Sequence, residues 1–340
     1  MNESVVKVEN LVKRYKELIA LDHLNLEVRE GEIFGLLGPN GSGKTTAINC
    51  ILSLLHYDKG SIEIFGSPMT PDSYDIKRQI GVVMQNVAVC DELTVYENID
   101  SFCGLYVPER TQRKPLVEEA MEFTGLTEFR NFRPKKLSGG LLRRLNIACG
   151  IAHKPRLIIM DEPTVAVDPQ SRNHILTGIE KLQSDGATII YTSHYMEEVE
   201  QICTRIAIID GGKNVALGTG DELKKMIRKS ETIRIDMPQP SPDDLAAIRS
   251  LPHIYECSWQ NHELTALCSG GSHNLIRVLS YLQEKDLPFG HVATQLPTLN
   301  DFFLELTGPD LRDQPKHLSL ILSTAPGPIF SAVRATALSP

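Results

Sequence analysis

The sequence predicts an α/β fold built on a parallel β-sheet, and three observations support this expectation. An apolar run at residues 33–37 leads through a glycine-rich loop into a helical pattern at residues 47–55. A second apolar run, at residues 157–160, ends in two carboxylates. Two more apolar runs, at residues 80–84 and 188–193, are each followed by a polar side chain. Parallel strands are buried on both faces and have continuous apolar sequences of this kind.

The glycine-rich loop has the pattern of a phosphate-binding P-loop. Its residues are Gly38, Pro39, Asn40, Gly41, Ser42, Gly43, Lys44, Thr45 and Thr46. Glycines allow backbone N–H groups to turn inward toward phosphate oxygens, and the N-terminus of the next helix adds partial positive charge there. Lys44 can reach the β- and γ-phosphates, and the Thr45 hydroxyl can ligate Mg²⁺. The pattern therefore predicts binding of a nucleoside triphosphate.

Polar side chains follow the other apolar runs at the points where strands are expected to end. Asp161 can hold Mg²⁺ through water, and Glu162 can take a proton from an attacking water. Gln85 and His194 also lie just past predicted strands, where ligands of open α/β sheets bind. Each of these residues taken singly is also compatible with an ordinary turn.

A second phosphate-binding helix end is predicted at Ser138, Gly139 and Gly140. Glycines after a serine leave the backbone unhindered at the start of the helical run that follows. One chain thus has two helix N-termini suited to phosphate.

In this order the motifs resemble those of one family, the ATP-binding subunits of ABC transporters, from about residue 5 to about residue 223. The resemblance implies the P-loop NTPase (ABC ATPase) fold, with an antiparallel β subdomain near its start and a helical subdomain around Ser138. It also implies a nucleotide-sandwich dimer with a second copy or a related ATPase subunit. In that dimer, the segment 138–140 of one copy closes over the ATP bound to Lys44 of the other.

The resemblance assigns roles to individual residues. It implies that Tyr15 stacks on adenine, that residues 38–46 are the Walker A loop, and that Asp168 belongs to the D-loop. Glu162 is implied as catalytic base and His194 as the switch histidine that touches the γ-phosphate, with Lys44 and Gln85 completing the catalytic set. The implied Mg²⁺ ligands are Thr45, Gln85 and Asp161.

Two segments depart from the family pattern. Leu141 follows the segment 138–140 where Gln or Met is more usual in the family, and its side chain cannot make the polar contact of a Gln. Ala166 and Val167 stand in the D-loop where a Gly-Leu pair is commoner. No residue to which the family assigns the chemistry is missing.

Charge and composition bound the class of partner. The net charge of −8 argues against a broad nucleic-acid surface, and we expect no nucleic-acid partner. Basic clusters at residues 13–16, 133–136 and 143–144 are expected to be solvated faces. Seven cysteines without a C-x-x-C pair favour a reducing compartment. The histidines show no metal-ligand spacing, so no structural metal is predicted.

The sequence predicts that any membrane path lies in another polypeptide. Its polar start is unlike a signal peptide. No segment approaches the roughly 18 uninterrupted apolar residues of a membrane span. By the resemblance, the partner is a multi-span permease and the chain lies peripherally on the cytoplasmic face of the cell membrane. Gln85 and the stretch 86–93 are the candidate contact, although an ordinary surface loop is an equal alternative. Thr94 with Glu97 predicts a capped helix start after that stretch.

A second, smaller domain is predicted after the first 226 residues. Residues 227–308 give strands at 233–237, 254–260, 264–268 and 291–296, and helices at 242–251, 275–287 and 299–306. The order βαββαβ is that of a small ferredoxin-like α+β unit. Its end resembles the accessory domain of ABC ATPases that export drugs, antibiotics and other amphipathic compounds. Residues 309–340 are predicted to be a disordered tail, because residues 314–340 contain no acidic residue and four prolines.

The function predicted from these features is ATP hydrolysis coupled to export by a separate permease. Two alternatives stay open at this point: a soluble ABC ATPase that acts on nucleic acid or ribosomes, and a non-hydrolysing ATP-dependent clamp. A single Walker A loop and the absence of sustained heptads disfavour the first alternative. Glu162 and His194 disfavour the second. The transported substrate and the choice of homodimer or heterodimer do not follow from the sequence.

Overall fold

The computed structural model describes residues 3–226, 231–269 and 273–307. Internal contacts group Met1–Phe302 as one unit, and the second unit, Phe303–Pro340, is described only as far as Thr307. The predicted tail lies outside the described residues. The domain boundaries after residues 226 and 308 remain predictions.

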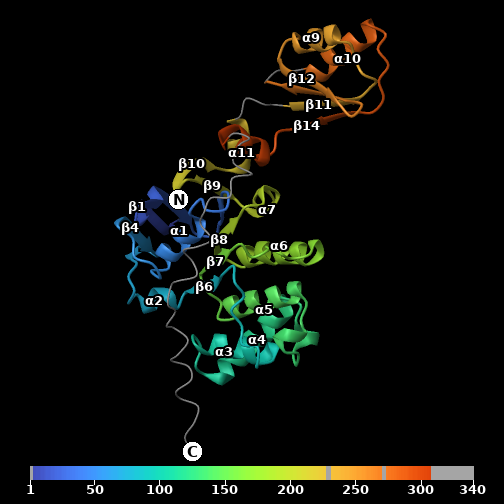
Figure 1. The fold of residues 1–340 in the computed structure, drawn as a ribbon. Coiled ribbons are helices and arrows are strands. Elements are labelled where there is room, and N and C mark those ends of the chain that lie inside the picture. Colours follow the sequence, from blue (N-terminus) through green and yellow to red (C-terminus); the bar gives the residue numbers. More distant parts are fainter. Residues whose placement is uncertain (1–2, 227–230, 270–272, 308–340) are drawn as a thin grey trace, which may run out of the picture. The chain divides into compact units, whose positions relative to one another are not determined.

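The central sheet is the parallel sheet that the apolar runs predict (Figure 1). All neighbouring strands in it are parallel except the β10–β9 pair. Every residue of the three inner strands that flank the nucleotide motifs is buried. The strand order is β10 (Lys213–Gly218), β9 (Arg205–Asp210), β3 (Ile33–Leu37), β8 (Thr188–Ser193), β7 (Leu157–Asp161) and β6 (Ile80–Val83).

Helices follow the strands of this sheet along the chain, and all but the last lie in sequence between two of its parallel strands. They are α1 (Lys44–Ile51), α5 (Gly139–Ile151), α6 (Pro169–Ser184), α7 (Met196–Ile202) and α8 (Gly220–Lys225). The first of them begins earlier and ends earlier than the predicted 47–55. Ser53 has a φ of 54°, a left-handed conformation that stops the helix, and the Asn49 carbonyl accepts the backbone N–H groups of Leu54 and Leu55.

The predicted antiparallel β subdomain is also present. Its sheet has the order β2 (Leu18–Arg29), β1 (Ser4–Tyr15), β4 (Lys59–Ile64) and β5 (Ser67–Pro68), with every neighbouring pair antiparallel. Apolar residues of this sheet, such as Leu11 and Ile64, share one buried cluster with Ile48 and Ile51 of α1. This shared core holds the sheet against the start of the nucleotide motif.

The predicted helical subdomain surrounds α5. It comprises α3 (Val95–Gly104), α4 (Arg110–Phe123) and α5, with the short elements α2 (Tyr74–Lys77), η1 (Thr127–Phe129) and η2 (Pro134–Lys136) nearby in the chain. Ile99, Val117, Met121 and Leu145 contribute to its buried core. Among the helices of the described ranges, none has both the length and the hydropathy to cross a bilayer.

A third sheet confirms the predicted ferredoxin-like unit. Its strands lie in the order β12 (Ile254–Gln260), β13 (Glu263–Cys268), β11 (Glu231–Asp236) and β14 (Val292–Gln295), and all neighbouring pairs are antiparallel. The helices α9 (Pro242–Arg249) and α10 (Asn274–Glu284) complete the βαββαβ order. Ile233, Leu264, Val278 and Leu282 share its core. A further helix, α11 (Leu299–Thr307), follows.

Candidate nucleotide-binding and catalytic site

The loop between β3 and α1 leaves the N-terminus of α1 without a side-chain cap. Gly43, which precedes α1, has a φ of 110° and makes no capping hydrogen bond. A Cβ at Gly43 would lie 2.7 Å from the carbonyl oxygen of Ala20, so the position requires glycine. Gly38 is enclosed as well, because a Cβ there would overlap the carbonyl oxygen of Ile209. The first N–H groups of α1 therefore face the loop, as an anion site requires.

The Lys44 ammonium lies inside this loop. Its Nζ donates hydrogen bonds to the carbonyl oxygens of Gly38 (2.8 Å) and Pro39 (3.2 Å) and lies 3.4 Å from Oε1 of Glu162. The side chain is 5% exposed. Burial lowers the pKa of Lys44, and the charge of Glu162 opposes that effect. The geometry places a buried cation between the loop that would hold phosphate and the predicted base.

The remaining loop residues differ in exposure. Asn40, Gly41 and Thr45 are exposed, Ser42 is buried, and Pro39 and Thr46 are half-buried. Ser42 donates its backbone N–H to the carbonyl of Pro39 (3.1 Å) and accepts at its own carbonyl from Gly212 (3.0 Å), which ties the loop to the turn after β9.

Two of the predicted Mg²⁺ ligands are in direct contact. The Thr45 hydroxyl donates to Oδ2 of Asp161 (2.9 Å), and the Thr192 hydroxyl donates to Oδ1 of the same carboxylate (2.6 Å). Asp161 ends β7 and is fully buried. The ends of three elements, α1, β7 and β8, thus meet at one carboxylate.

Glu162 is the point where the other predicted catalytic residues converge. Its Oε2 accepts from Nε2 of Gln85 (3.2 Å), and Nδ1 of His194 and Nζ of Lys44 lie 3.3 and 3.4 Å from its Oε1. The carboxylate is 7% exposed. Its backbone N–H donates to the Thr192 hydroxyl (2.9 Å), and its φ is 48°. A non-glycine residue in this conformation costs energy, and such strain gathers at functional sites.

Tyr15 lies at the rim of the site, at the end of β1. It is 41% exposed. Its hydroxyl interacts with the side chain of Thr46, while burial raises the pKa of the phenol. The Lys13 ammonium lies over the ring at 5.2 Å from its centroid. An exposed aromatic ring anchored to the last residue of the P-loop is suited to stacking on a base.

The second predicted phosphate-binding segment, residues 138–140, forms the N-terminus of α5. The Ser138 hydroxyl accepts from the backbone N–H of Leu141 (3.3 Å) and caps the helix. Gly140 packs against the D-loop, since a Cβ there would overlap the Ser171 hydroxyl and lie 2.9 Å from Oδ2 of Asp168. In the ranges that the structure describes, no hydrogen bond or ion pair joins residues 138–140 to the P-loop.

Asp168 is a helix cap in this structure. Its Oδ1 accepts from the backbone N–H of Ser171 (2.9 Å) at the start of α6. Hydrogen bonds from Ser171 lower the pKa of the Asp168 carboxyl. The D-loop before it includes Ala166, whose φ of 59° accounts for the usual preference for glycine at this position.

Arg143 corrects one prediction. The pair 143–144 was expected to be a solvated face, but Arg143 is 3% exposed. Its guanidinium donates to the backbone carbonyls of Gln85 and Glu162. In the sequence, the adjacent pair 143–144 gives no indication that one of its two arginines is buried. The pattern of α5, in which position 143 falls among apolar residues, was the available signal.

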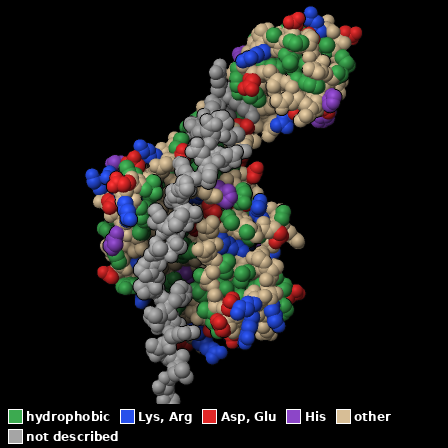
Figure 2. Space-filling view, viewed as in Figure 1, with side chains coloured by type: hydrophobic (Ala, Val, Ile, Leu, Met, Phe, Trp, Pro, Cys, Tyr) green, Lys and Arg blue, Asp and Glu red, His purple; other side chains and the backbone are tan. Residues whose placement is uncertain are grey.

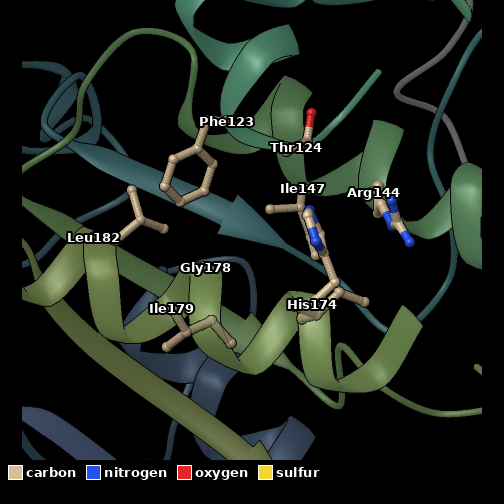
Figure 3. Close-up of a pocket in the computed structure, with 9 residues that line it drawn as sticks. Phe123, Thr124, Arg144, Ile147, His174, Gly178, Ile179 and Leu182 are labelled. Carbon is tan, nitrogen blue, oxygen red and sulfur yellow. The ribbon is translucent and has the colours of Figure 1, made fainter. Parts of the chain in front are cut away.

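A small pocket lies apart from these residues, where α4 and α5 face α6 (Figure 3). Arg144 of α5 and His174 of α6 lie along its wall. Burial, followed by the charge of Arg144, lowers the pKa of His174. The lining is mostly apolar and contains none of the predicted site residues; it consists of Phe123, Thr124, Arg144, Ile147, His174, Ile175, Gly178, Ile179 and Leu182.

Comparisons with known proteins identify the family. A family model described as ABC transporter matches residues 21–165. The linearmycin resistance ATP-binding protein LnrL of Bacillus subtilis is 39% identical, over 91% of this chain and 100% of that protein. The daunorubicin resistance ATP-binding protein DrrA3 of Streptomyces coeruleorubidus is 33% identical over 92% and 98%. The Nod factor export ATP-binding protein I of Ralstonia nicotianae is 33% identical over 91% and 95%.

Solved structures agree on the fold. A dimeric, post-hydrolysis structure of the ATP-binding cassette MJ0796 with ADP and Pi has a TM-score of 0.58 at 29% identity. The match covers 63% of this chain and 98% of that one. The chain therefore belongs to the ABC transporter family and is one of its ATP-binding subunits. Among its homologues are ATP-binding proteins of drug and antibiotic resistance and of Nod factor export.

Proposed function

We propose that this chain hydrolyses ATP with Glu162 as the base and thereby powers a separate membrane permease. The observation that carries the proposal is the convergence of Lys44, Gln85 and His194 on the buried Glu162 carboxylate. Phosphoryl transfer needs mainly positioning and charge neutralisation. Backbone N–H groups at α1 and the Lys44 ammonium can hold the β- and γ-phosphates, while Glu162 accepts the proton of a water that His194 and Gln85 orient.

The residues present also fit Mg²⁺. This cation prefers oxygen ligands, takes one or two from protein, and completes its shell with phosphates and water. A Thr45 hydroxyl and an Asp161 carboxylate already in contact are such a set, and the Gln85 amide, which donates to Glu162 next to Asp161 in the chain, is the third predicted ligand. In the residues described, no group of three or more His, Cys, Asp or Glu side chains could hold a metal on its own. When bound, the ion would neutralise charge on the phosphates.

We propose that the active unit contains two cassettes. The segment 138–140 and the P-loop are both suited to phosphate, and no hydrogen bond or ion pair among the described residues joins them. An isologous dimer would place the segment 138–140 of one copy over the ATP held by Lys44 of the other. Contacts between the segment 138–140 and the γ-phosphate would then exist only in the closed dimer, so hydrolysis would reopen it.

Relatives named for drug resistance and for export support a role in exporting drugs, antibiotics or other amphipathic compounds. The chain would then lie peripherally on the cytoplasmic face of the membrane, with Gln85 and residues 86–93 as the contact for the permease. On the face seen in Figure 2, acidic and basic side chains are interspersed rather than gathered into one basic surface. That distribution favours a protein partner over nucleic acid.

Phosphate release by the Glu162→Gln variant tests the hydrolytic part of the proposal. We expect ATP binding to persist and turnover to fall on the order of 10²–10⁴-fold, because the amide cannot accept the proton. Glu197→Gln, at an exposed position on α7, is the matched control and should keep normal turnover. Near-normal turnover in Glu162→Gln would contradict the assignment of the base.

A pull-down tests the transport part. The Glu162→Gln variant, loaded with ATP, should hold the closed dimer and any partner attached to it during purification from gently solubilised membranes. Recovery of a hydrophobic protein with several membrane spans would support the permease. Recovery with ribosomes or nucleic acid would overturn the transporter interpretation and leave the ATPase chemistry intact.

A further inference from the structure

The helix α5 joins two parts of the site through polar side chains that the family motifs do not include. Arg143 and Asn146 lie one turn apart on this helix, so both project from one face. They are 3% and 6% exposed. Both side chains contact the segment 84–88, which contains Gln85. The same helix begins at Gly139 with Ser138 as its N-cap, one to two turns before Arg143.

The Arg143 guanidinium bridges the backbones on either side of the catalytic contact. Its Nη1 donates to the carbonyls of Met84 (2.9 Å) and Gln85 (2.8 Å). Its Nη2 and Nε donate to the carbonyls of Glu162 (2.6 Å) and Pro163 (2.7 Å). One planar group thus holds the main chain of both residues whose side chains meet at 3.2 Å.

Asn146 fixes the far end of the same segment. Its Nδ2 donates to the Met84 carbonyl (3.3 Å), and its Oδ1 accepts from the backbone N–H of Ala88 (3.2 Å). The segment 84–88 is therefore held at its first residue by both side chains and at its last residue by Asn146. We call Arg143 and Asn146 together the α5 clasp.

Arg143 has an unusual environment for a cation. All of its hydrogen bonds in the described part of the chain go to neutral carbonyls, and burial lowers the pKa of the guanidinium. A buried charge that loses such partners is costly. The segment 84–88, which both side chains hold, is therefore expected to move with α5. Glu162 is held in addition on the central sheet, by the bond from its N–H to the Thr192 hydroxyl.

We propose that the α5 clasp is a positioning device that couples the phosphate-facing start of α5 to the contact between Gln85 and Glu162. This inference rests on the proposed hydrolytic function. A displacement of α5, when its N-terminus meets a phosphate on the second copy, shifts the backbone of Gln85 relative to Glu162. Misplacement of a catalytic group by about 1 Å is enough to change turnover on the order of 10²-fold. The clasp thus makes turnover depend on what residues 138–140 contact.

A clasp with a purely structural role would have a different effect when it is removed. It would only fasten the helical subdomain to the central sheet, and its loss would lower stability without acting through Gln85. Two substitutions that act through one contact are strongly non-additive, whereas independent effects multiply. A double-mutant cycle between Arg143 and Gln85 separates the two cases.

The experiment measures kcat and KM for ATP in the full chain with Arg143→Met, Gln85→Ala and both together. We expect Arg143→Met to lower kcat by about 10–100-fold with KM for ATP within about 3-fold. The double variant should be no worse than Gln85→Ala by more than about 3-fold. Arg143→Lys keeps the positive charge but loses the planar set of donors of the guanidinium, so it should give an intermediate kcat.

Arg113→Gln is the matched control. Its guanidinium is also held, by Asp100 and by the carbonyls of Val107 and Pro108, but it lies in the helical subdomain away from Gln85. It should lower thermal stability with little change in kcat. If Arg143→Met does not fold, Asn146→Leu replaces it in the double-mutant cycle with Gln85→Ala. This substitution removes the two hydrogen bonds of Asn146 to the segment 84–88 and leaves the Arg143 guanidinium in place.

Multiplicative losses in the cycle, or a kcat loss no larger than that of Arg113→Gln, would overturn the clasp. If the wild-type chain itself releases no phosphate above the Glu162→Gln background, the proposed function fails instead. The two failures are therefore distinguishable in one set of assays.

Discussion

Glu162, the proposed base, and the nearby Ala166 hold left-handed backbone conformations without being glycine. Glu162 has a φ of 48° and Ala166 a φ of 59°. The left-handed helix region costs an L-residue about 1–2 kcal/mol because Cβ approaches the following carbonyl. At Glu162 the strain accompanies a side chain with an assigned role. Ala166 is exposed, and its methyl group has no comparable role, so its strain is removable.

Replacing Ala166 with glycine should therefore stabilise the protein. We expect the free energy of unfolding to rise by about 0.5 kcal/mol, since relief of strain exceeds the added entropy of the unfolded chain. Urea denaturation measures the change. Ala246→Gly, in the exposed face of α9, is the control and should cost about 1 kcal/mol. Equal destabilisation by both substitutions would contradict the strained conformation of Ala166.

His153 gives a pH dependence that can be tested at the scale of one residue. Its ring stacks on Tyr106 with a centroid distance of 3.8 Å, and burial lowers the pKa of the imidazole to about 4. Because the pKa is lower in the folded state than the ordinary 6.5, protonation favours unfolding. Stability is therefore full above about pH 6.5 and falls as the pH drops toward 4.

The substitution His153→Phe should remove this part of the pH dependence. A phenyl ring keeps the stack and has no proton to bind. Between pH 6.5 and 4 we expect the variant to lose less stability than the wild type, by on the order of 2 kcal/mol after allowance for solvent screening. Urea titrations at several pH values measure it, with His56→Phe at an exposed position as control. Parallel pH profiles for His153→Phe and wild type would contradict the buried neutral imidazole.

At the residue scale, the sequence predicted the side chains of the candidate site better than the residues that hold those side chains in position. Gln85, Glu162 and His194 could be placed together because each follows a strand of one parallel sheet. Arg143 could not, because its burial depends on the carbonyls of residues 84, 85, 162 and 163 meeting in space. Sequence spacing carries no information about such a convergence of backbone groups.

At the element scale, local signals predicted helix starts better than helix ends. Thr94 forms the predicted capping box: its hydroxyl accepts from the Glu97 N–H (3.2 Å), and the Glu97 carboxylate accepts from the Thr94 N–H (2.8 Å). Hydrogen bonds from the Thr94 N–H and the Thr94 hydroxyl to the Glu97 carboxylate lower the pKa of Glu97. The end of α1 was predicted too late because Leu54 and Leu55 continue an apolar pattern past the left-handed Ser53.

Removal of this cap tests its contribution. Thr94→Ala should lower the free energy of unfolding by about 1 kcal/mol, because the Glu97 N–H at the start of α3 loses the hydroxyl that accepts its hydrogen bond. Thr94→Ser keeps the hydroxyl and should retain most of the stability. Thermal unfolding of the three proteins side by side is sufficient. An alanine variant as stable as the serine variant would show that the box adds nothing.

At the scale of the whole molecule, topology explains the site. Parallel order in the central sheet brings the carboxyl ends of β3, β6, β7 and β8 to one edge, which is why residues far apart in sequence meet at Glu162. The βαββαβ order of the third sheet was predictable because its strands and helices alternate clearly. The surface that a second copy uses depends on contacts between two chains, which the pattern of one sequence does not contain.

The central claim is that one ATP site takes Lys44 from one copy and residues 138–140 from another, and trans-complementation tests it most directly. Lys44→Ala removes the phosphate contact of the P-loop. Gly139→Asp places a carboxylate at the start of α5, where a Cβ meets nothing within 4 Å of its own chain. Each variant alone should be inactive. A mixed dimer would have one site with both lesions and one site intact.

Phosphate release from an equal mixture of the two variants is the decisive measurement. Random pairing makes half of the dimers mixed, each with one of two sites intact, so we predict about a quarter of wild-type activity. A mixture that gives only the sum of the two inactive variants would contradict the shared site.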